Sequence, residues 1–417
     1  AELDDAAITN RGTIDAEGGA VSWGAGDIYA MGLRQTEAGS VRADRFHAEA
    51  GADAVADLDG VIEVSNPDGP GGHAALTAGR LEVRGEINAS GSTGGGRVHL
   101  GGGPRGDTDL PHAQTVRVHH DARLLANAHA SGDGGEIVAY AERFTAFAGA
   151  AEATGGPLGG DGGFVEASAH DLVFRGAVDL SAVDGSTGEL LFDPTNITVV
   201  DGGPDADDDE LPDLSDADVG AGDFVIAEQA LELLAANASL ILEATNNITI
   251  EDIDDDQIAL PITSDGAVAL TADLDGDGAG SIVFNDTADE LLTEGGDVQL
   301  VAADLTLGSI NTRGLAGNVD GGAISIQTSA ANTILALGDD PGGNRLHLDG
   351  LELDGLFADA LSLHADANVL IDNVPLNATD STPLLDITSA AGDIRVLNNP
   401  STINSELTAV ANVGDDD

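Results

Sequence analysis

The stretch Gly85–Leu100, G-E-I-N-A-S-G-S-T-G-G-G-R-V-H-L, contains the pattern that decides the fold of this 417-residue chain. A short alternating run of apolar and polar residues is followed by a glycine turn and then by a second alternating run. Alternation with a period of two is typical of a strand with one buried face, and glycine is favoured where the chain turns tightly. The stretch therefore predicts two short strands separated by a glycine turn.

The same pattern recurs through most of the chain. Clear copies lie at Ala128–Ala139, Ala151–Ala167 and Val178–Phe192. Weaker copies are expected to turn at Gly19, Gly72, Gly266, Gly296, Gly322 and Gly392. From turn to turn, Gly72 to Gly96 spans 24 residues, Gly135 to Gly163 spans 28 and Gly163 to Gly188 spans 25.

A period of about 24 to 30 residues, built of short strands and glycine turns, indicates stacked coils. No single coil of this kind can bury its own apolar face, so each one depends on its neighbours. The sequence therefore predicts an all-β fold, a parallel β-helix or β-solenoid, with one short helix and a few inserted loops.

The repeats divide the chain into three predicted regions. Residues 1–200 and 240–417 are expected to form β-solenoid coils, and residues 201–239 an acidic loop plus a short helix that interrupts them. The helix is predicted over Ala227–Ala236, which has helical spacing of apolar residues and no Gly or Pro. Gly101–His112 is predicted to be a loop that bulges from one coil.

Composition limits the core and the membrane topology. The chain has no cysteine, 42% hydrophobic residues and only 3% aromatic residues, so we expect a narrow core of Ala, Val, Ile and Leu without disulfides. No stretch approaches the roughly 20 apolar residues of a membrane-spanning helix, and no basic region followed by an apolar run opens the sequence. We therefore expect a soluble chain that is either processed or a fragment.

The charge balance is strongly acidic. The formal net charge is -59, and all 15 basic residues are Arg. At about 1 M salt the Debye length is roughly 3 Å, so most of this self-repulsion would be screened. We therefore hypothesise a hypersaline habitat; the alternative is an acidic surface protein that uses divalent cations. The same charge argues against binding to nucleic acid and to anionic membranes.

The sequence D-x-D-x-D-G at Asp273, Asp275, Asp277 and Gly278 is the one candidate metal site. Three carboxylates could wrap one hard cation, and the glycine permits a sharp bend. The twelfth position of the loop is Phe284, where an EF-hand would have Glu. A partial Ca²⁺ site and a plain acidic turn both remain open.

Other chemistry has weaker support. The acidic runs Asp205–Glu210 and Asp252–Asp256 are either loose cation sites or solvated loops. His112, His119 and His120 form the closest set of histidines, but neighbouring residues of a strand point to opposite faces. The sequence has no G-x-S-x-G elbow and no phosphate-binding loop that enters a helix, so no catalytic or cofactor-binding residue is predicted.

Several stretches resemble the filamentous haemagglutinin-type adhesins of Gram-negative bacteria. The most specific is Glu189–Val200, E-L-L-F-D-P-T-N-I-T-V-V; others are Gly160–Ser168, Ala244–Ile250, Thr271–Ile282 and Leu307–Gly314. The resemblance implies a right-handed parallel β-helix that is exported by two-partner secretion. The family's N-terminal secretion domain is not recognisable, because the only near match to its Asn-Pro-Asn motif is Asn398–Pro400. We therefore expect an internal region of a longer protein.

These observations favour a non-enzymatic extracellular structural rod or adhesin, adapted to high salt and displayed on the surface of a halophilic Gram-negative bacterium. Its ends would be available for end-to-end self-association, and cell-surface or matrix glycans are possible partners. The alternative is a polysaccharide-binding or polysaccharide-cleaving β-helix protein that uses Asp-bound cations.

Overall fold

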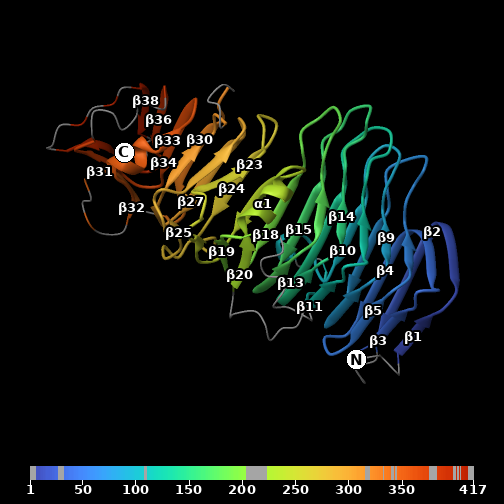
Figure 1. Ribbon diagram of the computed structural model, residues 1–417. Helices are drawn as coiled ribbons and strands as arrows, with labels where there is room; N and C mark the ends of the chain where they lie inside the picture. Colours follow the sequence, from blue (N-terminus) through green and yellow to red (C-terminus); the bar gives the residue numbers. More distant parts are fainter. Residues whose placement is uncertain are drawn as a thin grey trace, which may run out of the picture. The chain divides into compact units, whose positions relative to one another are not determined.

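Parallel strand pairing between successive coils organises the chain. The computed structural model describes residues 6–26, 32–107, 110–202, 223–314, 320–331, 333–339, 342, 345–374, 383–397, 401, 403 and 405–411. Contacts divide the chain into two units (Figure 1). The first unit comprises Ala1–Pro194, Asp208–Phe224 and Asn237–Ser239, and the second comprises Thr195–Asp207, Val225–Ala236 and Leu240–Asp417.

The first unit has three faces of parallel strands. The first face contains β2 (Thr13–Ala25), β4 (Ser40–Ala50), β7 (His73–Thr77), β10 (Arg97–Leu100), β13 (Glu136–Phe147), β15 (Phe164–Ser168) and β18 (Glu189–Asp193). The second contains β1 (Ala6–Asn10), β3 (Gly32–Gln35), β5 (Val55–Leu58), β8 (Arg80–Val83), β11 (Ala113–Val118), the end of β13 and β16 (Asp171–Phe174). The third contains the starts of β2 and β4 with β6 (Val61–Glu63), β9 (Glu86–Asn88), β12 (Arg123–Leu125), β14 (Ala150–Glu152) and β17 (Ala177–Asp179).

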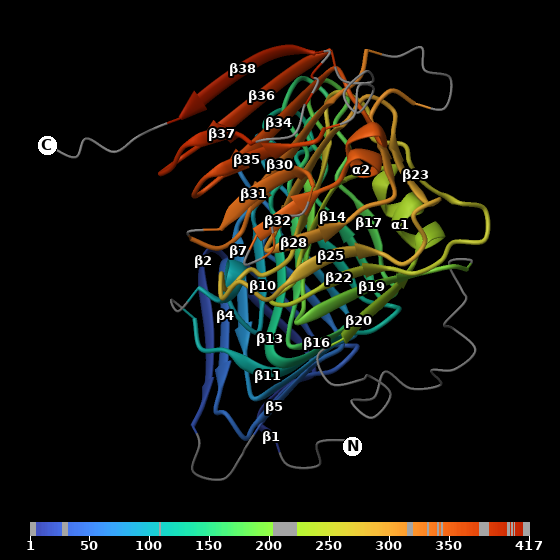
Figure 2. The same cartoon turned by 90° about the vertical axis from the view of Figure 1, so that its left-hand side faces the viewer.

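The second unit is also built of parallel strands. Its first sheet contains β21 (Ser239–Glu243), β24 (Ala267–Thr271), β27 (Asp297–Ala302), β30 (Ala323–Thr328), β34 (Ala360–Ala365), β36 (Leu384–Ser389) and β38 (Glu406–Ala411). A second contains β20 (Asp223–Ala227), β19 (Asn196–Val200), β22 (Ile248–Ile250), β25 (Ser281–Phe284) and β28 (Asp304–Thr306). Figure 2 shows β34, β36 and β38 side by side.

Two further sheets and two helices complete the second unit. One sheet contains β23 (Gln257–Leu260), β26 (Glu290–Thr293), β29 (Ser309–Asn311) and β33 (Leu356–Phe357). The other contains β32 (Arg345–Leu348), β31 (Ile334–Gly338), β35 (Val369–Asp372) and β37 (Ile394–Val396). The helices are α1 (Glu228–Ala235) and α2 (Gly350–Asp354).

The core consists of columns of like residues that stack from coil to coil. On the first face of the first unit, one inward column has no solvent exposure and contains Val98, Ile137, Val165 and Leu190. In the second unit the matching column contains Val268, Val298, Ile324, Leu361 and Leu385. Because the strand register is fixed, one apolar residue in each coil covers its counterpart in the next. The predicted parallel β-solenoid and its aliphatic core are confirmed.

Aromatic residues form a shorter column at one edge of the first unit's core. Phe147 stacks on Phe174 with ring centroids 5.3 Å apart, and Phe174 meets Phe192 edge-on at 4.8 Å. Phe192 in turn contacts Phe224 at 5.0 Å. These rings fill a wider part of the coil with few residues, since each aromatic side chain buries a large area.

The Gly-Gly turns of the first unit are required by backbone contact between coils. A Cβ atom on Gly135 would lie 2.1 Å from the carbonyl oxygen of Gly96, and one on Gly163 would lie 2.1 Å from that of Gly135. On Gly188 it would lie 2.0 Å from the oxygen of Gly163. None of these three glycines has a positive φ. They are therefore fixed by the lack of space for a side chain, and we call this set, with Gly96, the glycine column.

Several local predictions are confirmed and some are wrong. The helix predicted over Ala227–Ala236 is α1, and the loop predicted at Gly101–His112 lies between β10 and β11 with a short 3₁₀ turn. The turn predicted at Gly19 is wrong, because β2 continues through it with a register shift between Ala16 and Ala20. Gly18 absorbs that shift with a φ of 76°.

The helix α2 was not predicted, because its five residues are too few to show helical periodicity. Its start is fixed by a capping box in which the side chains of Asp349 and Glu352 bond each other's backbone N–H groups. No helix in the described residues is long and apolar enough to cross a membrane. Most of the acidic loop predicted within residues 201–239 lies outside the described residues, as do Asp205–Glu210 and Asn398–Pro400.

The glycine column gives a first prediction. Gly163→Ala should lower the free energy of unfolding of the first unit by about 1–3 kcal/mol, because the added methyl group meets the Gly135 backbone rather than a movable side chain. Trp23, 5% exposed and in contact with Phe46 in the same unit, provides the fluorescence signal for denaturant unfolding.

Gly24→Ala is the matched control, since nothing lies within 4 Å of a Cβ atom there. Equal stability of the Gly163→Ala variant and the control would contradict the steric origin of the turns.

Candidate functional site

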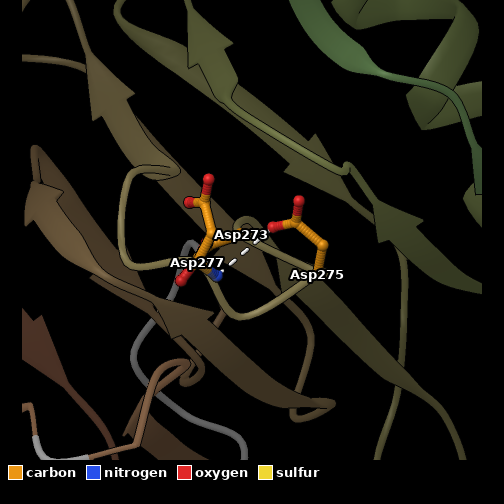
Figure 3. Close-up of side chains that lie close together, drawn as sticks. All are labelled: Asp273, Asp275 and Asp277. Atoms are coloured by element: carbon orange, nitrogen blue, oxygen red, sulfur yellow. Dashed lines mark hydrogen bonds between the residues drawn. The ribbon is translucent and has the colours of Figure 1, made fainter.

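The predicted metal-site residues lie together at one turn of the second unit, between β24 and β25 (Figure 3). One ligand oxygen each from Asp273, Asp275 and Asp277 lie within 4.8 Å of one another. Carboxylate oxygens are the ligands that hard cations prefer. The cluster could therefore hold a metal ion.

The three carboxylates have different surroundings. Asp273 is 2% exposed and has a φ of 60°, and both its carboxylate oxygens accept the backbone N–H of Gly278, at 3.0 and 3.1 Å. The hydroxyl of Ser329 also donates to Asp273. Asp273 therefore already holds the turn together, which leaves it fewer free lone pairs for a metal.

Asp275 and Asp277 are exposed and only weakly committed to the turn. The Asp275 carboxylate accepts the N–H of Asp277 at 3.4 Å, drawn as a dashed line in Figure 3, and the Asp277 carboxylate accepts the N–H of Ala279 at 2.9 Å. Phe284, the twelfth residue of the loop, is 1% exposed within β25 and provides no ligand. The turn thus provides three carboxylates and no bidentate closing ligand.

A second cluster, which was not predicted, surrounds Glu82 on the outward side of the first unit's second face. Glu82 is 4% exposed. Its carboxylate accepts hydrogen bonds from Arg80 at 2.5 Å, from Arg117 at 3.3 Å and from His119 at 2.7 Å. Arg84, which directly follows β8, lies 3.4 Å from the Glu82 carboxylate. Three arginines and a histidine therefore enclose one buried carboxylate; we call this the Glu82 cluster.

Strand register explains how the Glu82 cluster assembles. Asp57, Glu82 and Arg117 are consecutive register partners in β5, β8 and β11. The guanidinium of Arg117 also lies 5.3 Å from the centroid of the Phe144 ring, a cation–π contact. Arg117 thus faces Glu82 across the register, and Arg84 contacts both of the acidic neighbours Asp57 and Glu82.

The electrostatics of Glu82 follow from these contacts. Burial acts to raise its pKa, but the hydrogen bond from His119 and the charges of Arg80 and Arg117 prevail and lower it to about 2. The ionised carboxylate is therefore strongly preferred in the folded state.

A third cluster of titratable groups lies on the first face of the same unit. His99 bonds Glu136 at 2.6 Å, and its ring meets that of His73 edge-on with centroids 4.9 Å apart. Burial, together with the nearby His99 and Arg97, lowers the pKa of His73 to about 4, so His73 is neutral at physiological pH. Its Nε2 atom is buried without a hydrogen-bond partner.

Beside this cluster, the glycine column leaves a groove along the corner of the coils. Glycines line much of this groove and carry no side chains, so the lining side chains come only from the other residues around it. These residues are Arg97, Glu136, Asp161, Phe164, Ser186, Thr187 and Glu189. The backbone N–H groups of Gly96, Gly135, Gly163 and Gly188 are all bonded within the fold. The groove therefore offers side-chain contacts, three of them acidic, but no free backbone donors from these four glycines.

The histidines considered as a metal set do not converge. His119 bonds Glu82, whereas the exposed His120 contacts Asp121 at 3.1 Å. The His112 ring packs on Tyr140 at 4.9 Å. His119 and His120 thus have different partners, and both lie after the end of β11 at Val118, where the alternation of a strand does not apply.

Comparison with known proteins does not assign the chain to a family. No protein-family model matches the chain, and no curated protein is similar to it. Arguments about function therefore rest on the residues themselves.

The Glu82 cluster gives a prediction with a defined pH window. The pKa of Glu82 is about 2, against an ordinary value of 4.5, so its ionised form stabilises the fold above about pH 4.5, and this stability is lost as the pH falls toward 2. Glu82→Gln should lower the free energy of unfolding at pH 7 by about 3 kcal/mol and should remove the loss of stability within that window.

The measurement is denaturant unfolding followed by Trp23 fluorescence between pH 2 and 7. Glu189→Gln, at an exposed position of the same unit, is the control and should change stability by no more than about 0.5 kcal/mol. If the free energy of unfolding of Glu82→Gln fell between pH 4.5 and pH 2 as steeply as that of the unmodified chain, Glu82 would not be the group responsible.

Proposed function

We propose that this chain is part of a non-enzymatic extracellular structural rod or adhesin. The observation that carries the proposal is the in-register parallel stacking of coils in both units, each with a narrow aliphatic core. Such a fold grows in length by adding coils and presents long regular faces. The local resemblance of Glu189–Val200 to filamentous haemagglutinin-type adhesins supports the same function, with export by two-partner secretion to the surface of a Gram-negative bacterium.

End-to-end self-association forms part of this proposal. All six residues of β38 are exposed. Among the described residues, β38 pairs with β36 on one of its edges. A strand edge with free N–H and C=O groups is a template for a further strand. A second copy of the chain, or further coils of the same protein, would satisfy those groups.

Electron microscopy of the purified chain tests the proposal. We expect end-to-end fibres at high protein concentration, and a Leu407→Lys/Val410→Lys variant, which adds charge to exposed positions of β38, should give single particles. An equivalent double change in the turn between β17 and β18, Ser186→Lys/Thr187→Lys, is the control. Single particles at every concentration would contradict self-association, and release of new reducing ends from a polysaccharide panel would support the cleaving alternative instead.

We also propose adaptation to high salt. The 137 residues from Gly176 to Thr312 contain 32 Asp and Glu but no Arg, Lys or His, so protein cations within this segment cannot neutralise it. Solution cations must screen this charge, and the Debye length shortens from about 10 Å at 0.1 M salt to about 3 Å at 1 M.

The melting temperature should accordingly rise by about 10 °C or more between 0.1 M and 2 M NaCl. Circular dichroism melts at matched pH measure this rise. A melting temperature that stays flat across the series would exclude the high-salt adaptation.

For the Asp273, Asp275 and Asp277 cluster we propose Ca²⁺ as the ion. Ca²⁺ accepts irregular sets of oxygen ligands, whereas Mg²⁺ requires near-ideal octahedral geometry. An irregular turn with two exposed carboxylates suits the less demanding ion. Ser329, in the loop that follows β30, donates a hydrogen bond to Asp273. An ion bound to Asp273 would therefore be linked to that loop through this hydrogen bond.

A further inference from the structure

Two consecutive corners of the second unit, stacked in register, each carry several acidic residues. One corner, residues 251–256, joins β22 to β23, and the other, residues 285–289, joins β25 to β26 in the next coil. The N–H of Glu290 bonds the carbonyl of Asp256 at 3.0 Å, and the N–H of Ser309 bonds that of Asp289 at 2.8 Å. Asp256 and Asp289 therefore occupy equivalent positions in successive coils.

Asp289 is the unusual member of this set. Its residue is 0% exposed, yet neither carboxylate oxygen has a hydrogen-bond partner. The backbone N–H of Ile253 faces the carboxylate and acts to lower its pKa, but it does not reach hydrogen-bonding geometry. A buried, unpartnered carboxylate is costly, because its lost hydration is not replaced.

The charged groups that act on Asp289 are all negative and come from both corners. Burial raises the pKa of Asp289, and the charges of Asp286, Asp252 and Asp256 raise it further. No basic residue lies between Arg175 and Arg313 in the sequence, and the ion pairs found in this unit join Arg313 to Asp359 and Arg395 to Asp393. The described residues around Asp289 thus show carboxylates without a protein counter-ion.

Two occupants would relieve this arrangement, a proton or a cation. A proton removes the charge of Asp289 but leaves its hydroxyl and carbonyl oxygen still without partners, which costs about 1–3 kcal/mol per buried group. A hard cation satisfies both oxygens at once and also offsets the three neighbouring charges. Oxygen-only ligands on irregular loops suit Ca²⁺ better than Mg²⁺.

We propose that the corner formed by residues 251–256 and 285–289 binds Ca²⁺, with Asp289 as its buried ligand and Asp252, Asp256 and Asp286 as the acidic groups around it. We call this the Asp289 corner. It lies on different loops from the Asp273, Asp275 and Asp277 cluster and is independent of the proposed function. Bound Ca²⁺ would join two successive coils across their corners.

The test is a calcium titration of chelator-treated protein in NaCl of matched ionic strength, read by calorimetry and by melting temperature. The unmodified chain should melt about 5 °C or more higher at a hundredfold excess of Ca²⁺ over its Kd. Asp289→Asn should lose this gain at one site and, without Ca²⁺, should melt above the unmodified chain because the buried charge is gone. Asp275→Asn should keep the Asp289-dependent gain, which separates the two sites.

A second pair of variants does not disturb the buried position. Asp252→Asn/Asp256→Asn removes two exposed charges that act on Asp289, and Asp254→Asn/Asp255→Asn removes two charges from the same loop that do not. The first pair should weaken Ca²⁺ binding about tenfold, and the second should change it less than threefold.

Two results would overturn the proposal. One is an equal loss of affinity in both double variants, or an unchanged calcium response in Asp289→Asn, since either would reduce the effect to diffuse screening. The other is no response to Ca²⁺ beyond that to NaCl, together with a stability that falls as the pH rises through the raised pKa of Asp289. That result would show that a proton, rather than a cation, occupies the corner.

Discussion

The close approach of backbone to backbone at the Gly-Gly turns is the constraint on which the first unit depends. At Gly96, Gly135, Gly163 and Gly188 each coil rests on the carbonyl oxygen of the coil before it, at a distance that leaves no room for a Cβ atom. This contact fixes the height and register of each coil. Once the register is fixed, apolar residues stack into inward columns, and charged residues stack into outward ones.

The two units resolve the acidity of the chain in different ways. The first unit contains 12 of the 15 arginines against 37 acidic residues, whereas the second contains 3 arginines against 37. In the first unit, register places Arg117 against Glu82 and Arg97 against Glu136. The second unit has few basic residues to provide such partners, which is why we propose solution cations for its acidic turns.

This difference changes where chemistry is to be sought. The D-x-D-x-D-G turn is visible in the sequence and does assemble, but its first aspartate already serves the turn through Gly278 and Ser329. Asp289 belongs to no motif, because T-A-D-E resembles many acidic loops. Its importance arises from complete burial and from the corner of the preceding coil, and neither is encoded in local spacing.

The sequence by itself determined the fold class, the coil period, the strands around Gly96, Gly135, Gly163 and Gly188, and helix α1. It could do so because period-two alternation and glycine spacing are local and repeat many times. Only the tertiary structure decided which charged residues meet, because partners such as Glu82 and His119 lie a full coil apart, and coil lengths vary with inserted loops such as Gly101–His112. It also decided that β2 passes through Gly19, that α2 forms from five residues, and that Asp289 is buried, since burial depends on what the neighbouring coil places over each residue.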